Sequence, residues 1–344
     1  MMNIAVAMSG GVDSTVCASL LKSEGHNVTG FTALMYDGGD VTVHNAKVCA
    51  QHIGIEHIVL DLRDEFNKRI IEPFVQSYLN GRTPSPCIRC NRLIKFGLIL
   101  DSIIDAGIEQ IATGHYAAIH RDNKRFYLSQ AKDPIRDQSY FLFDLTQEQL
   151  KHILFPLANF SKDEIRNIAT THGLPAAKSK DSQEICFIPD NNYRGFIQDR
   201  CKTPDQGDIT DKSGKSFKKH DGIYRYTIGQ RRGLGISHSE PLYVTDIIPE
   251  ENRIIAGPKT DLFKNGLIAG SINFMKQSAF NNDNVFAKIR STQPAIPAKA
   301  TILENGKLKL IFEQPTMQIS PGQAAVLYDN KSNLLAGGWI ESAF

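Results

Sequence analysis

Long apolar runs are missing from this 344-residue sequence, which has no stretch of the roughly 18 apolar residues that a membrane-spanning helix requires. Residues 1–8 also lack the basic and apolar regions of a secretory signal. An excess of either charge is missing too, since 39 basic and 37 acidic side chains leave a net charge of +2. We therefore expect a cytoplasmic protein outside the membrane. Any contact with nucleic acid must then depend on a local excess of basic residues.

The remaining composition is that of a globular protein. Hydrophobic residues make up 41% of the chain and charged residues 22%, which excludes wholesale disorder. Six cysteines in a chain of this length, without a secretory signal, do not indicate a disulfide scaffold. At roughly 100–200 residues per domain, the length predicts two or three domains.

Strand and helix patterns alternate up to about residue 200. The predicted strands are 3–8, 28–34, 57–62 and 110–119, and the predicted helices are 14–23, 43–52, 64–79, 91–106, 147–153 and 161–172. Ser161 and Glu164 form a candidate capping box, and Gly173 is a stop signal. This alternation predicts an α/β domain, 1–202, with a parallel sheet covered by helices on both faces.

Only strand-like patterns follow. The predicted middle domain, 203–265, is small and β-rich, with strands at 224–228, 242–248 and 253–256. The predicted third domain, 266–344, has six strands, at 267–274, 285–290, 298–303, 308–312, 324–328 and 334–341. Asn305-Gly306 is a strong hairpin signal between two of them. Six short strands predict a small β-barrel.

A glycine-rich loop, SGGVDS at residues 9–14, stands between the first predicted strand and helix. Backbone N–H groups and a helix N-terminus at such a junction bind anions. The loop has no lysine, unlike a Walker loop. Ser9, Ser14 and the main chain must therefore hold pyrophosphate, with Asp13 available for Mg²⁺. The string resembles the PP-loop of the N-type ATP pyrophosphatases, which split ATP between its α- and β-phosphates.

The cysteines fall into two groups. Cys17 and Cys49 lie in apolar helical patterns and are predicted to be core residues. Cys87 and Cys90 precede a helix predicted to start at Asn91, whose N-terminus would lower the pKa of Cys90. Arg89, Arg92 and Lys95 would act in the same direction. One cysteine pair with a distant Cys186 argues against a closed zinc site, and the role of Cys201 stays open.

Six motifs occur in one order along nearly the whole chain: SGGVDS, RTPSPCIRCN followed by KFG, ATGHYA, RDQSYFL, KDSQEICFI and YTIGQRRGLG. Together they resemble the tRNA-specific 2-thiouridylases of bacteria and organelles. The resemblance implies ATP-dependent adenylation of O2 of the wobble uridine in tRNA. Sulfur would then come from a persulfide on Cys186, loaded by a cysteine desulfurase or a sulfur-relay protein. Cys90 would be the second catalytic thiol and would form a disulfide with Cys186.

The same resemblance assigns binding residues. The residues implied for ATP are Ala7, Met8, Ser9, Gly10, Gly11, Val12, Asp13, Ser14 and Gly114, of which Asp13 also counts as catalytic. Met35 is predicted to contact adenine because the predicted strand 28–34 ends there. Those implied for tRNA are Ser85, Pro86, Cys87, His115, Arg136, Asp137, Gln138, Arg290, Ser291 and Gln323.

Cys87 departs from the family pattern, which has an acidic residue there. A third thiol opens a second hypothesis, in which Cys87, Cys90 and Cys186 hold a [4Fe–4S] cluster that carries the sulfur.

A basic stretch, 202–232, contains eight Lys or Arg and four Asp, a net charge of +4. Arg231 lies there in the glycine-rich GQRRGLG segment, close to Tyr224 and Tyr226. Guanidinium groups and aromatic rings are typical of RNA contacts, so we expect Arg231 to bind tRNA.

Two other functions remain open. A PP-loop synthetase of small metabolites would explain SGGVDS but not the reactive cysteines. A non-catalytic RNA-binding or metal-storage protein would explain the barrel and the cysteine pair but not the phosphate loop.

Overall fold

The computed structural model of the chain describes residues 1–122, 125–179, 185–202 and 205–344. Residues 180–184 of the KDSQEICFI motif and the predicted start of the middle domain at 203 lie outside the described residues. The chain divides into two compact units. The first comprises residues 1–71, 87–187 and 331–335, and the second comprises 72–86, 188–330 and 336–344. None of the described helices is long and apolar enough to cross a membrane.

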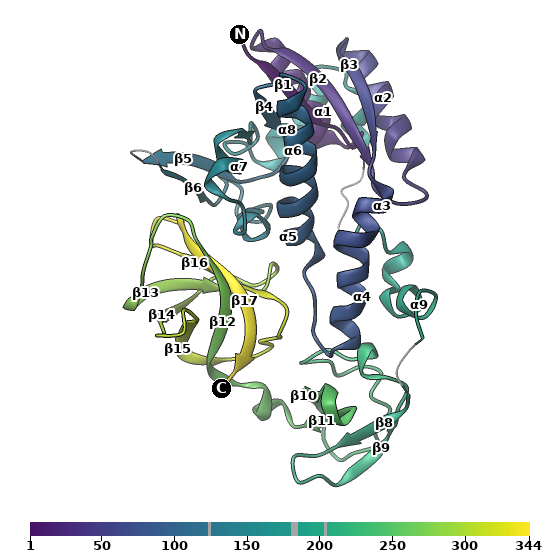
Figure 1. Cartoon of the computed structure of the whole chain (residues 1–344), viewed down its shortest axis with the longest axis vertical. Helices are drawn as coiled ribbons and strands as arrows, with labels where there is room; N and C mark the ends of the chain where they lie inside the picture. Colours follow the sequence, from purple (N-terminus) through teal and green to yellow (C-terminus); the bar gives the residue numbers. More distant parts are fainter. Residues whose placement is uncertain (123–124, 180–184, 203–204) are drawn as a thin grey trace. The chain divides into compact units, whose positions relative to one another are not determined.

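The first unit contains a five-stranded parallel sheet with the order β3-β2-β1-β4-β7 (Figure 1). Its strands are β1 (Asn3–Ala7), β2 (Asn27–Leu34), β3 (Glu56–Asp61), β4 (Gln110–Ala112) and β7 (Ile153–Leu154). This confirms the predicted parallel sheet.

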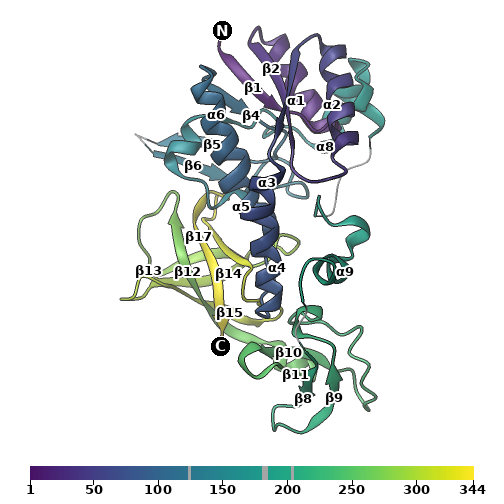
Figure 2. The same ribbon diagram turned by 45° about the vertical axis from the view of Figure 1, so that its right-hand side comes forward.

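Helices cover the sheet. Alongside α1 (Val12–Ser23), α2 (Asp40–Ile53) and α8 (Lys162–Thr171), which share one apolar core with it, the unit contains α3 (Arg63–Phe66), α5 (Pro86–Cys90), α6 (Ile99–Asp105) and α7 (Gln147–Lys151). Helix α6 packs on β4 (Figure 2). Cys17 and Cys49 are buried in the core, as predicted. The Ser161–Glu164 capping box is also confirmed.

Short elements complete the first unit. Helix α3 continues directly into a π-helical turn, η1 (Asn67–Ile71), and α5 continues into a second π-helical turn, η2 (Asn91–Leu98). A two-stranded hairpin consists of β5 (Ala118–Asp122) and β6 (Arg125–Ser129). Two 3₁₀ turns are η3 (Ser139–Leu142) and η4 (Pro175–Lys178).

Two predicted boundaries in this unit are wrong. The strand predicted over 110–119 ends at Ala112, because Gly114 turns against the phosphate loop, where a Cβ atom would lie 2.9 Å from Ser14 N. The helix predicted from Asn91 begins five residues earlier, at Pro86. Proline suits a first helical position because its missing N–H would have no partner there.

The second unit contains α4 (Glu72–Leu79), α9 (Tyr193–Gln198), a small sheet and a closed barrel (Figure 2). The sheet has the order β10-β11-β8-β9, with β8 (Gly207–Thr210), β9 (Ser216–His220), β10 (Tyr243–Ile248) and β11 (Arg253–Gly257). The barrel has the order β12-β15-β14-β13-β16-β17, with β12 (Lys264–Phe274), β13 (Asn281–Lys288), β14 (Ile296–Ile302), β15 (Leu308–Thr316), β16 (Ala324–Tyr328) and β17 (Leu334–Ala343). The 3₁₀ turns described in the second unit are η5 (Pro189–Asn191), η6 (Ile223–Arg225), η7 (Pro249–Glu251) and η8 (Lys259–Leu262).

The six-stranded barrel and the hairpin turn at Asn305-Gly306 are confirmed. The strand predicted over 224–228 is wrong. Its first residues belong to the 3₁₀ turn η6 instead. Gly222 and Gly229 lie on either side of this turn, and their φ values of +104° and +88° bend the chain. Aromatic and β-branched residues indicated a strand there, but two glycines in the left-handed region leave too little extended backbone for one.

Candidate active site

The predicted phosphate loop joins β1 to α1. Gly10 has a φ of +71°, and a Cβ atom there would lie 2.5 Å from the Cβ of Asn45 in α2. Only glycine meets both conditions. Gly11 follows as the N-cap residue of α1 with extended backbone. The unpaired N–H groups of the first turn of α1 therefore lie at the loop, where they favour an anion.

Two serine hydroxyls hold the loop in shape. Ser14 Oγ accepts a hydrogen bond from Ser9 N at 3.2 Å and donates one to the Gly11 carbonyl at 3.1 Å. The hydroxyl oxygens of Ser9 and Ser14 lie 3.3 Å apart. The two serines expected to bind pyrophosphate thus already organise the loop.

A cavity of about 340 Å³ opens beside this loop. All residues predicted to bind ATP line it except Gly10, which is buried against α2. Three residues predicted to bind tRNA, His115, Arg136 and Gln138, line the same cavity. Its apolar wall includes Met8, Phe31, Met35, Ile99 and Ile111. A lining that combines these polar groups and apolar side chains suits a ligand with phosphates and a flat heterocycle.

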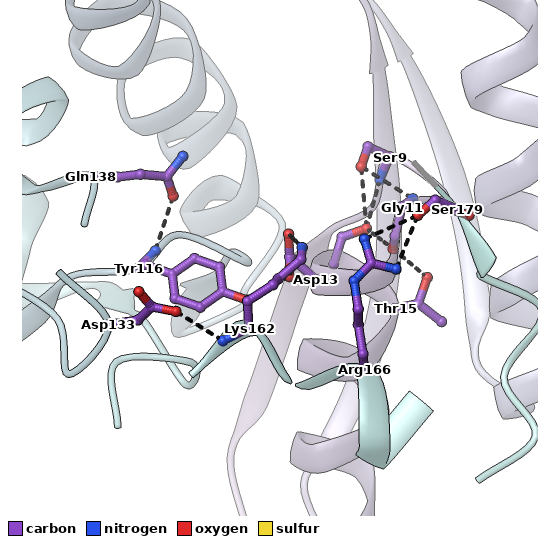
Figure 3. Close-up of polar contacts among 11 residues, drawn as sticks. Ser9, Gly11, Asp13, Thr15, Tyr116, Asp133, Gln138, Lys162, Arg166 and Ser179 are labelled. Atoms are coloured by element: carbon purple, nitrogen blue, oxygen red, sulfur yellow. Dashed lines mark hydrogen bonds and ion pairs between the residues drawn. The ribbon is translucent and has the colours of Figure 1, made fainter. Parts of the chain in front are cut away.

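A lysine reaches the loop from α8, although the loop itself has none. Lys162 Nζ lies 2.8 and 2.7 Å from the two carboxylate oxygens of Asp13, and the Tyr116 hydroxyl donates to Asp13 Oδ1 at 2.7 Å (Figure 3). The Lys162 side chain is only 9% exposed. Mg²⁺ is commonly held by one or two carboxylates together with phosphate oxygens. The Asp13 carboxylate can therefore bind a Mg²⁺ ion once the Lys162 ammonium has moved away from it.

The helix formed by α5, η2 and α6 carries Cys87 and Cys90. Cys90 has helical backbone angles inside this helix, so its thiol is not at the helix N-terminus as predicted. Cys90 is buried, whereas Cys87 and Cys186 are exposed. The π-helical turn η2 begins directly after Cys90, and such turns are frequent at functional sites.

The prediction of a lowered pKa for Cys90 is wrong. Loss of hydration is the largest cause in each case and raises the pKa of all three thiols, that of Cys90 to about 12. The charge of Lys95 lowers the pKa of each of them. The three thiols lie close enough for Cys87 and Cys186 to raise the pKa of Cys90 further. Among the described residues, however, no group of three His, Cys, Asp or Glu side chains could hold a metal ion.

His115 lines the cavity and contacts two aromatic rings. Its ring centroid is 5.9 Å from that of Phe96 and 5.7 Å from that of Phe155. Burial, followed by the charge of Lys95, holds its pKa well below the usual value, so the imidazole is neutral at pH 7. Its Nδ1 lies 2.7 Å from the Thr113 hydroxyl. A neutral imidazole here can position a base by hydrogen bonding.

Two other residues predicted to contact tRNA, Gln138 and Asp137, form hydrogen bonds within the first unit. Gln138 Oε1 accepts a hydrogen bond from Tyr116 N at 3.0 Å. Asp137 is buried and accepts hydrogen bonds from Ala131 N, Ser139 N and Ser139 Oγ, so it shapes its own loop.

Gln323 and Arg290 of the barrel hold backbone segments. Gln323 Nε2 donates to the carbonyls of Thr83 and Pro84 at 3.0 and 3.2 Å, although about 240 residues separate them. Arg290 Nε donates to the Gln318 carbonyl at 2.8 Å. Gln323 therefore supports the segment that leads to the remaining predicted tRNA contacts Ser85, Pro86 and Cys87, whereas Ser291 lies in a turn after β13.

Arg231 is exposed in the loop between η6 and β10. Hydrogen bonds from Gly229 N to Val244 O and from Val244 N to Gln230 O tie this loop to the small sheet. A Cβ atom on Gly235 would lie 3.0 Å from Lys218 Nζ of β9. The loop that carries Arg231 therefore passes next to Lys218 of the basic stretch.

Sequence reasoning named one lysine of the site and missed another. Lys95, which was expected to lower the pKa of Cys90, lowers the pKa of all three thiols and also lines the cavity. Lys162 has no local signal except its position after the capping residue Ser161, because its partner Asp13 is 149 residues away.

Comparison with known families matches the chain in three segments. The model described as tRNA methyl transferase HUP domain matches residues 2–190, the tRNA methyl transferase PRC-barrel domain matches 194–258, and the aminomethyltransferase beta-barrel domain matches 264–340. Among solved structures, the U34-tRNA thiolase NcsA from Methanococcus maripaludis with its [4Fe-4S] cluster is 19% identical over 58% of this chain and 64% of its own, with a TM-score of 0.38. A likeness this low adds nothing to the assignment.

Named relatives match the chain from end to end. The tRNA-specific 2-thiouridylase MnmA of Geobacter metallireducens (strain ATCC 53774 / DSM 7210 / GS-15) is 42% identical, with 99% of this chain and 97% of the relative covered. The protein of the same name from Clostridium perfringens (strain 13 / Type A) is 43% identical, with 98% and 97% covered. This chain therefore belongs to the tRNA-specific 2-thiouridylase family, MnmA, and is an enzyme of that sulfur-transferring family.

Proposed function

We propose that this enzyme forms 2-thiouridine at the wobble position of tRNA in the cytoplasm, with ATP and Mg²⁺, by a persulfide route. Lys95 carries the proposal, because it lines the nucleotide cavity and its charge acts on Cys87, Cys90 and Cys186. A shared cation of this kind supports adenylation and sulfur transfer at neighbouring positions. We also propose that residues 1–202, 203–265 and 266–344 act as catalytic, tRNA-contacting and barrel domains.

In the first step, uridine O2 attacks the α-phosphorus of ATP. The bond from that phosphorus to the bridging oxygen breaks, pyrophosphate leaves with the electron pair, and the N3 proton passes to solvent. The phosphate loop with Ser9 and Ser14 binds the phosphates, and Asp13 would hold Mg²⁺, which would neutralise charge on them. The neutral His115 positions the base at the cavity edge.

In the second step, a persulfide donor, either a cysteine desulfurase or a sulfur-relay protein, has loaded Cys186 with a terminal sulfur. This sulfur attacks C2 of the activated base, and the bond from C2 to the AMP oxygen breaks. The Cys90 thiolate then attacks Sγ of Cys186. The base leaves as 2-thiouridine and regains a proton at N3, while Cys90 and Cys186 form a disulfide. A thiol reductant supplies the two electrons that reopen it.

Contacts to tRNA come from both units in this proposal. Arg136 and Gln138 at the cavity, Arg231 on the exposed loop, and Arg290, Ser291 and Gln323 of the barrel are the candidates. Asp137 acts indirectly, by holding the loop that carries its two neighbours.

The test is a reaction with ATP, Mg²⁺, a persulfide source and unmodified tRNA, in which 2-thiouridine and pyrophosphate are both measured. The proposal requires both products in equal amounts per turnover. Pyrophosphate without thiolated tRNA would favour a small-metabolite synthetase. Neither product would favour an RNA-binding protein without catalysis.

A [4Fe–4S] cluster on Cys87, Cys90 and Cys186 is the competing sulfur route, favoured by the electrostatic proximity of the three thiols. As placed, these residues do not form a metal-binding group in the described part of the chain, so we route no step through a cluster. Anaerobic reconstitution with iron and sulfide separates the routes. Iron-free enzyme that still thiolates tRNA from a persulfide source supports our proposal, whereas activity that requires bound iron overturns the persulfide route.

A further inference from the structure

The first residue of α8 is a lysine whose position has no evident purpose in the helix itself. Lys162 is nearly buried, and its ammonium contacts both carboxylate oxygens of Asp13 in the phosphate loop. Placing an ammonium and a carboxylate out of water costs free energy, which their attraction often fails to recover. A pair that served only to pack α8 against α1 could be replaced by apolar side chains.

The surroundings of Lys162 are those of an anion site. It lines the cavity together with Ser9, Gly11, Asp13 and Ser14, the groups expected to bind the phosphates. A lysine in that position supplies a point charge to phosphate oxygens, as the lysine of a Walker loop does. The PP-loop of this chain lacks that residue, and α8 brings one to the same place.

The backbone around Lys162 is fixed. Ser161 and Glu164 form the capping box of α8, and Lys162 N donates to Asp133 Oδ2 at 3.0 Å (Figure 3). The backbone of Lys162 is therefore held in place, and only its side chain has to move when the ammonium changes partner.

Asp13 keeps a second partner if Lys162 turns away. The Tyr116 hydroxyl donates to Asp13 Oδ1 at 2.7 Å. An exchange of partners by Lys162 would therefore not leave the carboxylate bare.

We propose that Lys162 is the phosphate-binding lysine of this enzyme. When ATP binds, its ammonium passes from Asp13 to oxygens of the β- and γ-phosphates, which leave as pyrophosphate, and Asp13 becomes available to Mg²⁺. This inference deepens the proposed function and rests on it for the identity of the nucleotide.

The test measures binding of ATP, inorganic pyrophosphate and AMP to tRNA-free protein by calorimetry. Lys162→Gln should weaken ATP and pyrophosphate by about 10- to 100-fold and leave AMP almost unchanged, because AMP lacks the two outer phosphates. Lys162→Arg keeps the charge and should retain part of the affinity. Lys132→Gln is the matched control, since Lys132 forms an exposed ion pair with Glu164 of the same helix and does not line the cavity.

Equal losses for ATP and AMP would show a merely structural role and overturn the inference, as would unchanged affinities or no pyrophosphate binding by the wild type. If Lys162→Gln fails to fold because Asp13 is left unpaired, the comparison moves to Asp13→Asn with and without Lys162→Gln, in EDTA with pyrophosphate as the probe. The double variant, which lacks Lys162, should then bind pyrophosphate more weakly than Asp13→Asn alone. Equal binding by the two variants overturns the inference.

Failure of the two proposals can be told apart. A wild type that binds ATP and pyrophosphate but makes no 2-thiouridine overturns the proposed function and leaves the role of Lys162 standing. Thiolation of tRNA with an unchanged ratio of ATP to AMP affinity in Lys162→Gln overturns the role of Lys162 alone.

Discussion

The phosphate loop and the cysteine helix lie in the same unit but differ in readiness for chemistry. The loop is held by its own serines, and Asp13 and Lys162 neutralise each other until a ligand arrives. The thiols are the opposite case, because desolvation raises the pKa of all three. The nucleotide half is thus organised in advance, whereas the sulfur half depends on a neighbouring cation and, in the proposed route, on a loaded persulfide for its nucleophile. A persulfide suits such a site, since the attacking sulfur need not be a buried cysteine thiolate.

The largest expected effect separates the two halves outright. Cys186→Ser should reduce 2-thiouridine formation by at least about a thousandfold, because the sulfur carrier is lost, while ATP affinity stays unchanged. Cys201→Ser is the control, since its thiol donates to the Ile197 carbonyl outside the cavity. Single-turnover assays with persulfide-loaded protein measure the first quantity and calorimetry the second. Substantial thiolation by the serine variant would remove Cys186 from the mechanism.

The nucleotide half can be damaged without touching a thiol. In Gly114→Ala the new Cβ atom would meet Asp13 C and Ser14 N at 2.9 Å, so the loop must shift. We expect ATP affinity to fall about tenfold or more, since the phosphate donors lose their alignment. Gly107→Ala, in a turn with open space around it, controls for a general loss of stability. An unchanged dissociation constant would mean that Gly114 does not shape the site.

The sulfur half should respond to pH where the nucleotide half does not. Because the pKa of Cys90 is raised to about 12, its thiolate fraction is small at pH 7 and grows about tenfold per pH unit. Release of 2-thiouridine in a single turnover should therefore accelerate steadily between pH 6 and 8. Pyrophosphate formation should stay level, since His115 remains neutral over that range. A plateau in the release rate near pH 7 would contradict the raised pKa.

Lys95 offers a smaller, graded perturbation. Its charge lowers the pKa of each thiol, so Lys95→Met should raise all three and slow release by several-fold at pH 8. Lys95→Arg should restore most of the rate because the positive charge returns. The readout is the rate of single-turnover release at pH 8 in the methionine and arginine variants. A rate that Lys95→Arg fails to restore would assign Lys95 to packing instead.

The smallest effect concerns tRNA. Arg231→Ala should weaken tRNA binding a few-fold and lower the salt slope by about one unit, as expected for one phosphate contact, with ATP binding intact. Lys212→Ala is the control, because Lys212 already pairs with Asp261 at 3.2 Å. Binding titrations at several salt concentrations measure the slope. An unchanged slope for Arg231→Ala would count against a phosphate contact.

Local signals predicted much of this molecule. Gly10 and Gly11 before a helix, the Ser161–Glu164 capping box and the Asn305-Gly306 hairpin each depend on residues a few positions apart, and their physics acts within one turn of chain. The cysteine helix was placed five residues late because Pro86, a helix-starting residue, stands in a proline-rich segment that resembles a loop.

The sequence by itself therefore determined the alternation of strands and helices in the parallel-sheet domain, the closed barrel, and the glycine-rich loop between the first strand and helix. Tertiary structure alone decided what surrounds those groups. Burial reversed the predicted pKa shift of Cys90, and folding brought Lys162 to Asp13 and Gln323 to Thr83 across 149 and 240 residues. The reason is that hydration and charge–charge energies depend on the three-dimensional surroundings of a side chain, which no local pattern in the chain encodes.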